Sequence, residues 1–182
     1  MFRHGIFFVL SLFVLAGLMS GAEQAFEMTQ PGTVELKTLP AGRLLESRSE
    51  QPYFSSSNNL FGPLFRYISR NNISMTTPVE ARMNPGSMYF WVASDQVDKA
   101  SANTNSVRVL DVPERKVASI GARGSYSETN YEAARKTLME WLAQQESIKA
   151  IGEPYAVFWH GPFTPWFMKT FEVHVEVSQA DV

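Results

Sequence analysis

The chain has 182 residues, a formal net charge of −2 at neutral pH, 13% aromatic residues and no cysteine. The absence of cysteine excludes disulfides, thiol nucleophiles and thiolate metal sites, so the fold must rely on its core. Lysine and arginine are scattered singly along the chain, which argues against a nucleic-acid partner because phosphate binding requires clustered cations. The length predicts one domain.

The N-terminus has the pattern of a secretory signal peptide. A short basic start precedes an apolar run from Ile6 to Leu18 and then the small residues Ser20, Gly21 and Ala22. We expect residues 1–22 to be cleaved, since the apolar run is shorter than the roughly 20 residues that a membrane-spanning helix needs. The mature protein is therefore expected to be periplasmic or secreted, with no membrane span.

The next segments alternate between strand and helix patterns. Residues 23–32 are polar and are expected to form a flexible lead. Apolar residues on both sides of the turn at 40–42 predict a first hairpin, with its second strand ending at Arg48. The following apolar residues repeat on one helical face, which predicts a helix over 57–70 with Pro63 tolerated in its first turn.

The segment 73–83 reads "ISMTTPVEARM" and has the two-residue period of a strand. One face is expected to be the core face, and it carries Ile73, Met75, Thr77, Val79, Ala81 and Met83. Pro78 has no backbone N–H for a sheet ladder, so this strand is expected at a sheet edge or at a bulge.

The rest of the chain repeats this pattern. A central strand is expected at 87–94, followed by a pair of strands at 107–112 and 115–122 that are joined by Pro113-Glu114. An apolar stripe predicts a second helix over 127–146, with Leu138 and Trp141 in the stripe. The segments "PYAVFWH" and "FEVHVEV" predict the last two strands.

The order strand, strand, helix, strand, strand therefore occurs twice. Two such units in one antiparallel sheet predict an α+β fold with a pseudo-two-fold repeat. In this fold a twisted antiparallel sheet or barrel is flanked by two α-helices. We expect the domain to span residues 33–178, with a tail at 179–182.

Several of these segments resemble those of the SOUL family of haem-binding proteins. They read "LFRYISRNN", "ISMTTPV", "VPERKVASIGARGSYSETNY", "GEPYAVFWHGPFTPWF" and "FEVHVEV". The resemblance covers about residues 33–177, and Met75 to Val79 form its most specific motif. It implies a two-fold repeated fold related to bacterial small-molecule effector-binding domains. It also implies binding of haem or another tetrapyrrole in a shallow apolar groove against the first helix.

The chain departs from the family pattern at two places. The last motif reads "KTFEV", with Phe171 where the family usually has asparagine. Some members have been assigned an axial histidine early in the domain, but this chain has no histidine between His4 and His160. If it binds haem, it does so without that ligand.

Seven residues are candidates for the tetrapyrrole groove: Phe61, Leu64, Phe65, Arg66, Arg70, Met75 and His160. The apolar members would form a slab for the ring, and Arg66 or Arg70 would pair with the propionates. The alternative for the phenylalanines is ordinary packing in the core.

The two histidines of the domain each have two interpretations. His160 lies in an aromatic-rich loop, where it could ligate iron or could be a turn histidine bonded to backbone. His174 alternates with Glu172 and Glu176 on one strand face, and a solvated face is favoured there over a metal site. Whether the chain binds a metal ion is left open.

The sequence shows no catalytic motif. No serine has a nucleophile-elbow context, no carboxylate is placed by pattern in an apolar pocket, and no glycine motif would cradle phosphate. The predicted function is therefore non-enzymatic: binding of haem or a related tetrapyrrole for transport, buffering or scavenging in the cell envelope. The expected partner is a small planar hydrophobic ligand. The alternative is a binder or hydrolase of another flat hydrophobic molecule, by analogy with related folds.

Overall fold

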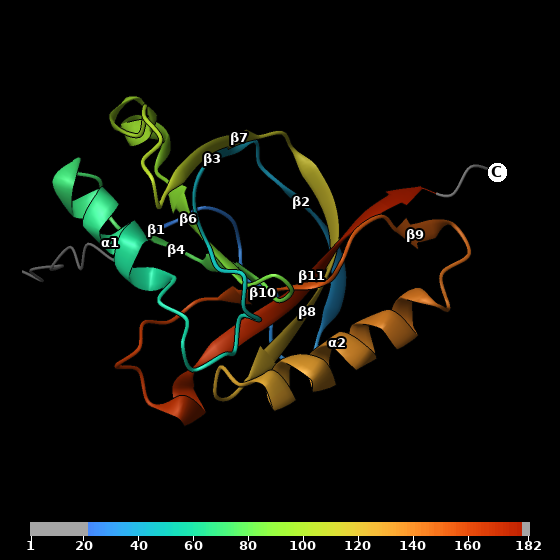
Figure 1. The fold of residues 1–182 in the computed structure, drawn as a ribbon. Helices are drawn as coiled ribbons and strands as arrows, with labels where there is room; N and C mark the ends of the chain where they lie inside the picture. The colour runs from blue at the N-terminus through green and yellow to red at the C-terminus, as the bar shows by residue number, and fades with distance from the viewer. Residues whose placement is uncertain (1–21, 180–182) are drawn as a thin grey trace, which may run out of the picture.

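The structure, a computed structural model, describes residues 22–179 (Figure 1). Its strands are β1 (Glu23–Gln24), β2 (Val34–Leu39), β3 (Gly42–Arg48), β4 (Thr76–Thr77), β5 (Val79–Arg82), β6 (Ser87–Val92), β7 (Arg108–Val112), β8 (Arg115–Arg123), β9 (Ile148–Ala150), β10 (Tyr155–Phe158) and β11 (Thr170–Gln179). Its helices are α1 (Phe61–Arg70) and α2 (Glu128–Leu142), with 3-10 turns η1 (Ser94–Lys99) and η2 (Trp166–Met168). The predicted signal peptide and C-terminal tail lie outside the described residues, apart from residues 22 and 179.

Nine of the strands form one antiparallel sheet that curls into a half-barrel (Figure 1). Its order is β2-β8-β11-β10-β5-β6-β3-β7, with β9 paired to β11. The sheet therefore has an inner, concave face and an outer face. The C-terminal strand lies in its middle, between β8 and β10.

The predicted hairpin around Pro40 is wrong, whereas the two strands predicted on either side of Pro113-Glu114 are present as β7 and β8 but do not pair with each other. β2 does not pair with β3 but with β8, and β3 pairs with β7. The segments β2–β3 and β7–β8 are thus two long strands that bend at these prolines and pair with one another along their length. Proline interrupts the hydrogen-bond ladder, which allows the bend at both places.

The predicted repeat is confirmed by the order of the elements. The first unit contains β2, β3, α1, β5 and β6, and the second contains β7, β8, α2, β10 and β11. The two units pair with each other at β2–β8, β3–β7 and β5–β10. The β5–β10 pairing, with Val79 opposite Phe158, lies in the middle of the strand order and divides the sheet into two halves. This junction is the seam between the two halves.

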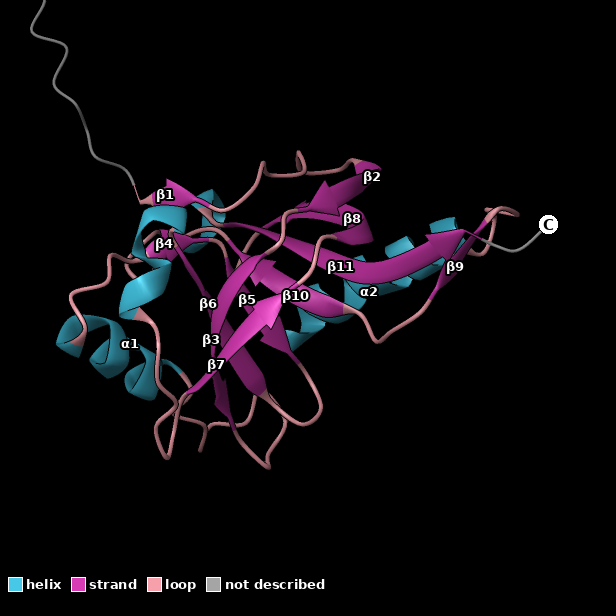
Figure 2. Cartoon of the chain, turned by 90° about the horizontal axis from the view of Figure 1, so that it is seen from above, coloured by secondary structure: helices cyan, strands magenta, loops and turns pink. Residues whose placement is uncertain are grey.

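Both helices cover the outer face, one over each half (Figure 2). α1 packs Leu64 and Ile68 against β3 and β6, and Pro63 lies in its first turn as predicted. α2 packs the fully buried Leu138 against β8 and β11, and Ser127 caps its N-terminus by accepting the Asn130 N–H. Both helices are shorter than the predicted ranges.

The strand predicted at 73–83 is divided at Pro78 into β4 and β5. The proline is in this interruption, but β5 is not at an edge, because β10 and β6 pair on either side of it. The face that was not expected to be core is also buried, with Thr76 and Glu80 nearly inaccessible to solvent. The strand therefore separates two buried regions.

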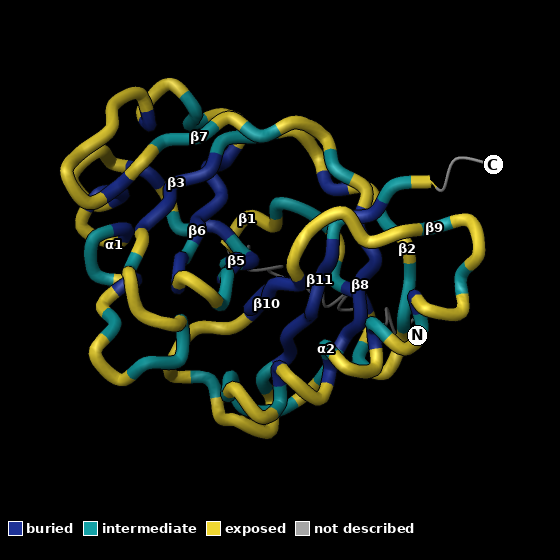
Figure 3. Tube along the Cα trace, turned by 45° about the vertical axis from the view of Figure 1, so that its right-hand side comes forward, coloured by how far each residue is buried: buried dark blue, intermediate teal, exposed yellow. Residues whose placement is uncertain are grey.

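The inner face of the half-barrel is covered by the chain's own N-terminal segment, residues 22–33, which we call the strap. Its strand β1 pairs in parallel with β4, and Thr29 is almost fully buried. The sequence predicted only a flexible lead here, because a polar composition gives no indication of these contacts. With both faces covered, the central strands are largely buried (Figure 3). In the part of the chain that the structure describes, no helix is long and apolar enough to cross a membrane.

Candidate functional site

An open apolar groove of about 630 Å³ lies on the outer face at the seam between the two halves. Its floor contains Val79 and Phe158, the neighbours that join β5 to β10. Phe61 and Phe65 of α1 form one wall, and the loop after β10 forms the other. The remaining lining residues are Ala22, Tyr53, Met75, Thr77, Met88, Tyr126, Trp159, His160, Gly161, Pro162 and Lys169.

The motif that carries the family resemblance forms part of this groove. Met75 just before β4, Thr77 in β4 and Val79 in β5 alternate along the chain and line it. The residues between them point to the inner face, where Thr76 bonds the backbone carbonyl of Trp91. Because side chains of a strand alternate between faces, this short motif contributes to both sides of the sheet.

Helix α1 offers the groove only one of its faces. Phe61 and Phe65 are one turn apart, stack with ring centroids 5.6 Å apart, and remain 43% and 51% exposed. Leu64 is fully buried beneath them in the core. Arg66 and Arg70 lie on another side of the helix, where they line a separate polar depression with Asn71.

The structure therefore brings together Phe61, Phe65, Met75 and His160 of the seven predicted site residues, and it leaves out Leu64, Arg66 and Arg70. The cation that lines the groove is Lys169, at the far wall. The sequence placed both arginines near the phenylalanines because they are close in sequence. A residue one position after Phe65 is, however, about 100° around the helix from it.

The ring and backbone of His160 are both held by neighbouring residues. Its backbone N–H donates to the Tyr126 hydroxyl at 2.8 Å, and its Nε2 lies 2.9 Å from the Thr170 hydroxyl. The Thr170 hydroxyl donates to the Met28 sulfur, so its oxygen accepts a hydrogen bond from the Nε2–H of His160. Partial burial and the charges of Lys169 and Arg123 lower the pKa of His160, which keeps the ring neutral at neutral pH.

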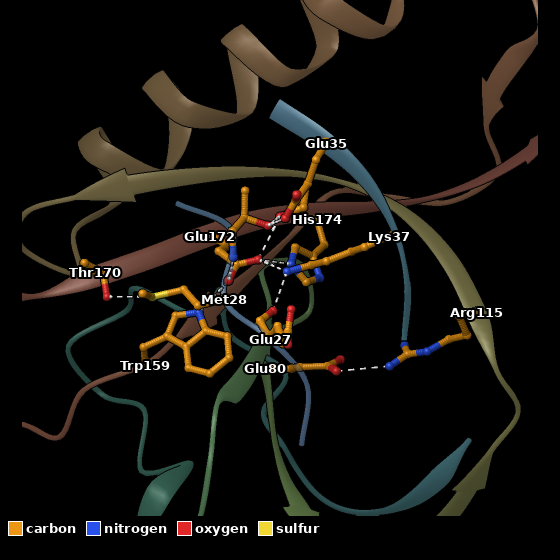
Figure 4. Close-up of polar contacts among 12 residues, drawn as sticks. Glu27, Met28, Glu35, Lys37, Glu80, Arg115, Trp159, Thr170, Glu172 and His174 are labelled. Atoms are coloured by element: carbon orange, nitrogen blue, oxygen red, sulfur yellow. Dashed lines mark hydrogen bonds and ion pairs between the residues drawn. The ribbon is translucent and has the colours of Figure 1, made fainter. Parts of the chain in front are cut away.

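The inner face carries a different kind of site, a buried polar network centred on Glu172 (Figure 4). The Glu172 carboxylate accepts five hydrogen bonds from groups on the strap, on β2, on β8, after β10 and on β11. The donors are Thr29 N (2.9 Å), Lys37 Nζ (2.6 Å), Ser119 Oγ (2.7 Å), Trp159 Nε1 (2.6 Å) and His174 Nε2 (2.5 Å). The expectation of a solvated face at Glu172 and His174 is therefore wrong, since both side chains are fully buried by the curl of the sheet.

The proton positions in this network follow from burial. Burial lowers the pKa of His174 in spite of its bond to Glu172, so the imidazole is neutral at neutral pH. Its Nδ1 has no hydrogen-bond partner within residues 22–179, so a proton there would lack an acceptor. Burial alone would raise the pKa of Glu172, but the bond from His174 and the charge of Lys37 outweigh it and lower this pKa to about 2.

A second buried carboxylate lies nearby on the same face. Glu80 accepts hydrogen bonds from Trp91 Nε1 and from the Arg115 guanidinium, each at 3.0 Å. Arg115 also reaches Glu176 at 3.4 Å. The sequence offered no carboxylate in an apolar pocket, because the partners of Glu80 come from β6 and β8, distant in sequence.

The strap closes this interior. The Phe26 ring contacts Trp91, Trp159 and His174 edge-on or tilted, with centroids 5.6–5.8 Å apart. The Lys37 ammonium lies 5.2 Å from the Phe26 ring centre. The charges of Glu172 and Glu80 are paired within the protein, so the interior stabilises the fold, and the open groove is the candidate site.

Sequence reasoning missed the interior, although one signal pointed to it. The strand at 87–92 is apolar on both faces, and a sheet that buries both faces of one strand must also bury the facing residues of its neighbours. Among the described residues no cluster of three or more histidine, aspartate or glutamate side chains could hold a metal ion.

Comparisons with solved structures confirm the fold class. The C-terminal domain of EcmrR matches with a TM-score of 0.65 at 16% identity, over 81% of this chain and 98% of that domain. In an EcmrR–DNA complex the TM-score is also 0.65, at 15% identity, and the match covers 81% of this chain and 58% of the EcmrR chain. A hydrolase from Listeria innocua matches with a TM-score of 0.58 at 10% identity, over 82% of this chain and 94% of that one. At these identities the likeness shows the fold alone.

In comparisons by sequence, no curated protein matches the chain. The model of the SOUL heme-binding protein family matches residues 22–176, which includes both halves of the sheet and every residue of the groove.

Proposed function

Since the chain belongs to the SOUL heme-binding protein family, we propose that it binds haem or a related tetrapyrrole reversibly in the groove at the seam. The observation that carries this proposal is an open, almost wholly apolar groove with stacked phenylalanines on one wall and a lysine on the other. The proposed role is transport, buffering or scavenging in the cell envelope, without catalysis.

The groove fits the chemistry of this ligand. Haem supplies a flat apolar ring, two propionate carboxylates and an iron that takes axial ligands. The groove's 630 Å³ is within the range of about 300–1,000 Å³ that small-molecule sites occupy. Phe61, Phe65 and Phe158 offer aromatic surface to the ring, and Lys169 would pair with a propionate.

Iron ligation by histidine is not required in this proposal. His160 lines the groove, but its Nε2 is bonded to Thr170. Affinity would then come from buried ring area and one charge-assisted contact, which supports dissociation constants of about micromolar. Metal-free protoporphyrin should bind about as well as haem.

The proposed location is outside the cytoplasm, through the N-terminal signal sequence. Sequencing the N-terminus of the exported protein tests it: Glu23 as the first residue supports cleavage, and a retained Met1 contradicts it. The dispersed cations of the chain support a partner other than nucleic acid.

The binding proposal is tested by titrating the wild type and four variants with haem and with protoporphyrin. Phe65→Asp and Lys169→Glu should weaken both ligands, by about ten-fold or more for Phe65→Asp because it places a charge on the apolar wall. Arg66→Glu is the matched control for Lys169→Glu, since it makes the same charge change outside the groove. His160→Ala should have little effect on either ligand.

Two results would contradict the groove as the haem site. If His160→Ala abolishes haem binding and Phe65→Asp does not change it, the loop histidine is the site. If Arg66→Glu weakens binding as much as Lys169→Glu, the effect is general electrostatics.

The alternative function is binding or hydrolysis of another flat hydrophobic molecule. The similar Listeria innocua protein is described as a hydrolase, and its likeness to this chain is in fold. Following product as well as fluorescence quenching over a panel of porphyrins, bilins and planar drugs separates the two. Product beyond one equivalent would show an enzyme, and stoichiometric quenching without product would show a binder.

A further inference from the structure

The loop between β10 and β11 exposes large apolar side chains that nothing in the described chain covers. We call residues 160–169 the aromatic loop. Phe163 is 98% exposed and Trp166 is 68% exposed, and Phe167 and Met168 are more than half exposed. Figure 1 shows the loop, in orange-red, projecting at the lower left of the molecule, below α1.

The exposure is built into the loop's geometry. Trp166 to Met168 form the turn η2, in which the Met168 N–H donates to the Pro165 carbonyl at 2.9 Å. Trp166 and Phe167 meet edge to face at 5.8 Å and present both rings outward. Exposed apolar surface is unfavourable in water, and a concentration of it marks a surface that another phase or molecule covers.

The base of the loop carries positive charge. Lys169 ends the loop, and Arg123 lies opposite the next residue, Thr170, across the β8–β11 ladder. Both charges act on His160, whose pKa they help to lower. Within residues 22–179 neither cation is in ion-pair distance of a carboxylate. The Lys169 ammonium has only a long bond of 3.4 Å to the Pro162 carbonyl and a contact of 4.9 Å with the Tyr126 ring, so the charges of both cations are available to an external anion.

Projecting rings above unpaired cations fit a lipid surface better than a protein surface. A protein partner would have to supply a cavity for each projecting side chain, whereas the boundary of a bilayer accepts a projecting apolar loop of any outline. Tryptophan and phenylalanine partition into this boundary, and lysine and arginine bind the phosphates of anionic lipids.

We propose that the aromatic loop docks the protein on an anionic lipid bilayer. Phe163, Trp166 and Phe167 enter the headgroup boundary, and Lys169 and Arg123 lie at the level of the phosphates. The proposal of docking is argued from the loop and the cations at its base, and it does not depend on what the groove binds. Its consequence for the groove rests on the proposed function: Gly161 and Pro162 of the same loop line the groove, so a docked protein would exchange an apolar ligand with the bilayer.

The lack of cysteine permits a direct test of docking, because any introduced cysteine is unique. Thr164→Cys carries an environment-sensitive fluorophore between the anchoring side chains. Ile151→Cys carries the same label at an exposed apolar position directly after β9, and Figure 1 shows β9 on the opposite side of the molecule from the loop. Each labelled full chain is mixed with vesicles of phosphatidylglycerol and phosphatidylcholine, or of phosphatidylcholine alone, without any tetrapyrrole.

Docking predicts a blue shift at position 164 with the anionic vesicles, a smaller one with neutral vesicles, and none at position 151. Adding Trp166→Ser and Phe167→Ser should reduce the vesicle affinity measured at position 164 by about ten-fold or more. Arg123→Gln should reduce the difference between anionic and neutral vesicles. Since no tetrapyrrole is present, these results are independent of whether the groove binds one.

Three outcomes would overturn the proposal. The first is that the fluorescence of the label at position 164 does not shift with any vesicle. The second is that the labels at positions 164 and 151 shift equally. The third is that the label at position 164 shifts without vesicles as the protein concentration rises. The last result would show that a second copy of the chain covers the loop.

Discussion

The groove and the strap-covered interior lie on opposite faces of the same strands, and they differ in how far their side chains are covered. In the interior, the charge of Glu172 meets five donors and Phe26 fills the space between two tryptophans. In the groove, Phe61 and Phe65 stack on each other and remain about half exposed. A region whose charges are paired and whose side chains are buried stabilises the fold, and a region whose apolar side chains stay exposed can bind a ligand.

The strand at the seam shows how closely the two regions are joined. Val79 contributes to the groove, and the next residue, Glu80, is bonded to Trp91 and Arg115 in the interior. Substitutions that face the interior should therefore change stability, and substitutions that face the groove should change ligand binding, even where the two residues are neighbours in sequence.

The largest effect on stability is expected from Glu172→Gln, which should lower the free energy of unfolding by about 3–5 kcal/mol. The amide keeps the shape but leaves the part-buried Lys37 ammonium without its counter-charge inside the network. Glu176→Gln is the matched control on the same strand and face, because Glu176 is part-exposed and its ion-pair contacts are 3.3–3.4 Å. It should cost about 1 kcal/mol or less. Equal losses in urea denaturation would mean that burial of the network does not matter.

Acid should destabilise the protein through the same network. The Glu172 pKa is about 2 when folded against 4.5 when unfolded, so its contribution of about 3 kcal/mol is present above pH 5 and is lost as the pH falls toward 2. His174 acts in the same direction at higher pH: its folded pKa lies below 6.5, so the unfolded chain takes up the proton first. Urea denaturation between pH 8 and 4 should show falling stability, and His174→Asn should flatten the upper part of that curve. A curve that rises toward acid would contradict both assignments.

Phe26→Ala tests whether the strap stabilises the fold. The side chain is partly buried, so we expect a loss of about 1–3 kcal/mol, below the range for a fully buried phenylalanine. Leu36→Ala, at a half-exposed position on β2, is the control and should stay within about 0.5 kcal/mol of wild type. If Phe26→Ala is as mild as the control, the strap lies on the interior without closing it.

The smallest effect on stability is expected in the groove. Phe65→Asp should unfold within about 0.5 kcal/mol of wild type, because the ring is half exposed, while its tetrapyrrole affinity falls. Glu172→Gln should show the reverse, with lower stability and unchanged affinity under conditions where it is folded. If either variant changes both properties, the two faces are coupled through the strand between them.

Much of this fold could be predicted from local pattern. The period of 3.6 residues located α1 and α2, and the doubled order of elements gave the repeat. The pairing of strands was less accessible, because a proline turn such as the one at Pro40 suits both a hairpin and a bend. Only the distant partner strand decides between them.

The site could be predicted only in part, because some of its residues are brought together by strands that are distant in sequence. Phe61 and Phe65 could be assigned to one helix face, whereas Lys169 is a single cation in a loop and gains its position only through folding. Glu172 and His174 were recognised as sharing a strand face, but nothing local shows that the sheet curls toward that face. Burial of a strand face depends on the whole sheet, and so does the pKa of each group on it.

The position of β11 has a consequence for incomplete chains. This strand, Thr170–Gln179, is the last element of the sheet in sequence, yet it pairs with both β8 and β10. A chain that ends before Thr170 would leave one long unpaired edge on each of these strands and would lack the carboxylate that Lys37 requires. Unpaired edges recruit strands from other molecules. Products of premature termination or C-terminal proteolysis should therefore aggregate instead of persisting as smaller folded proteins.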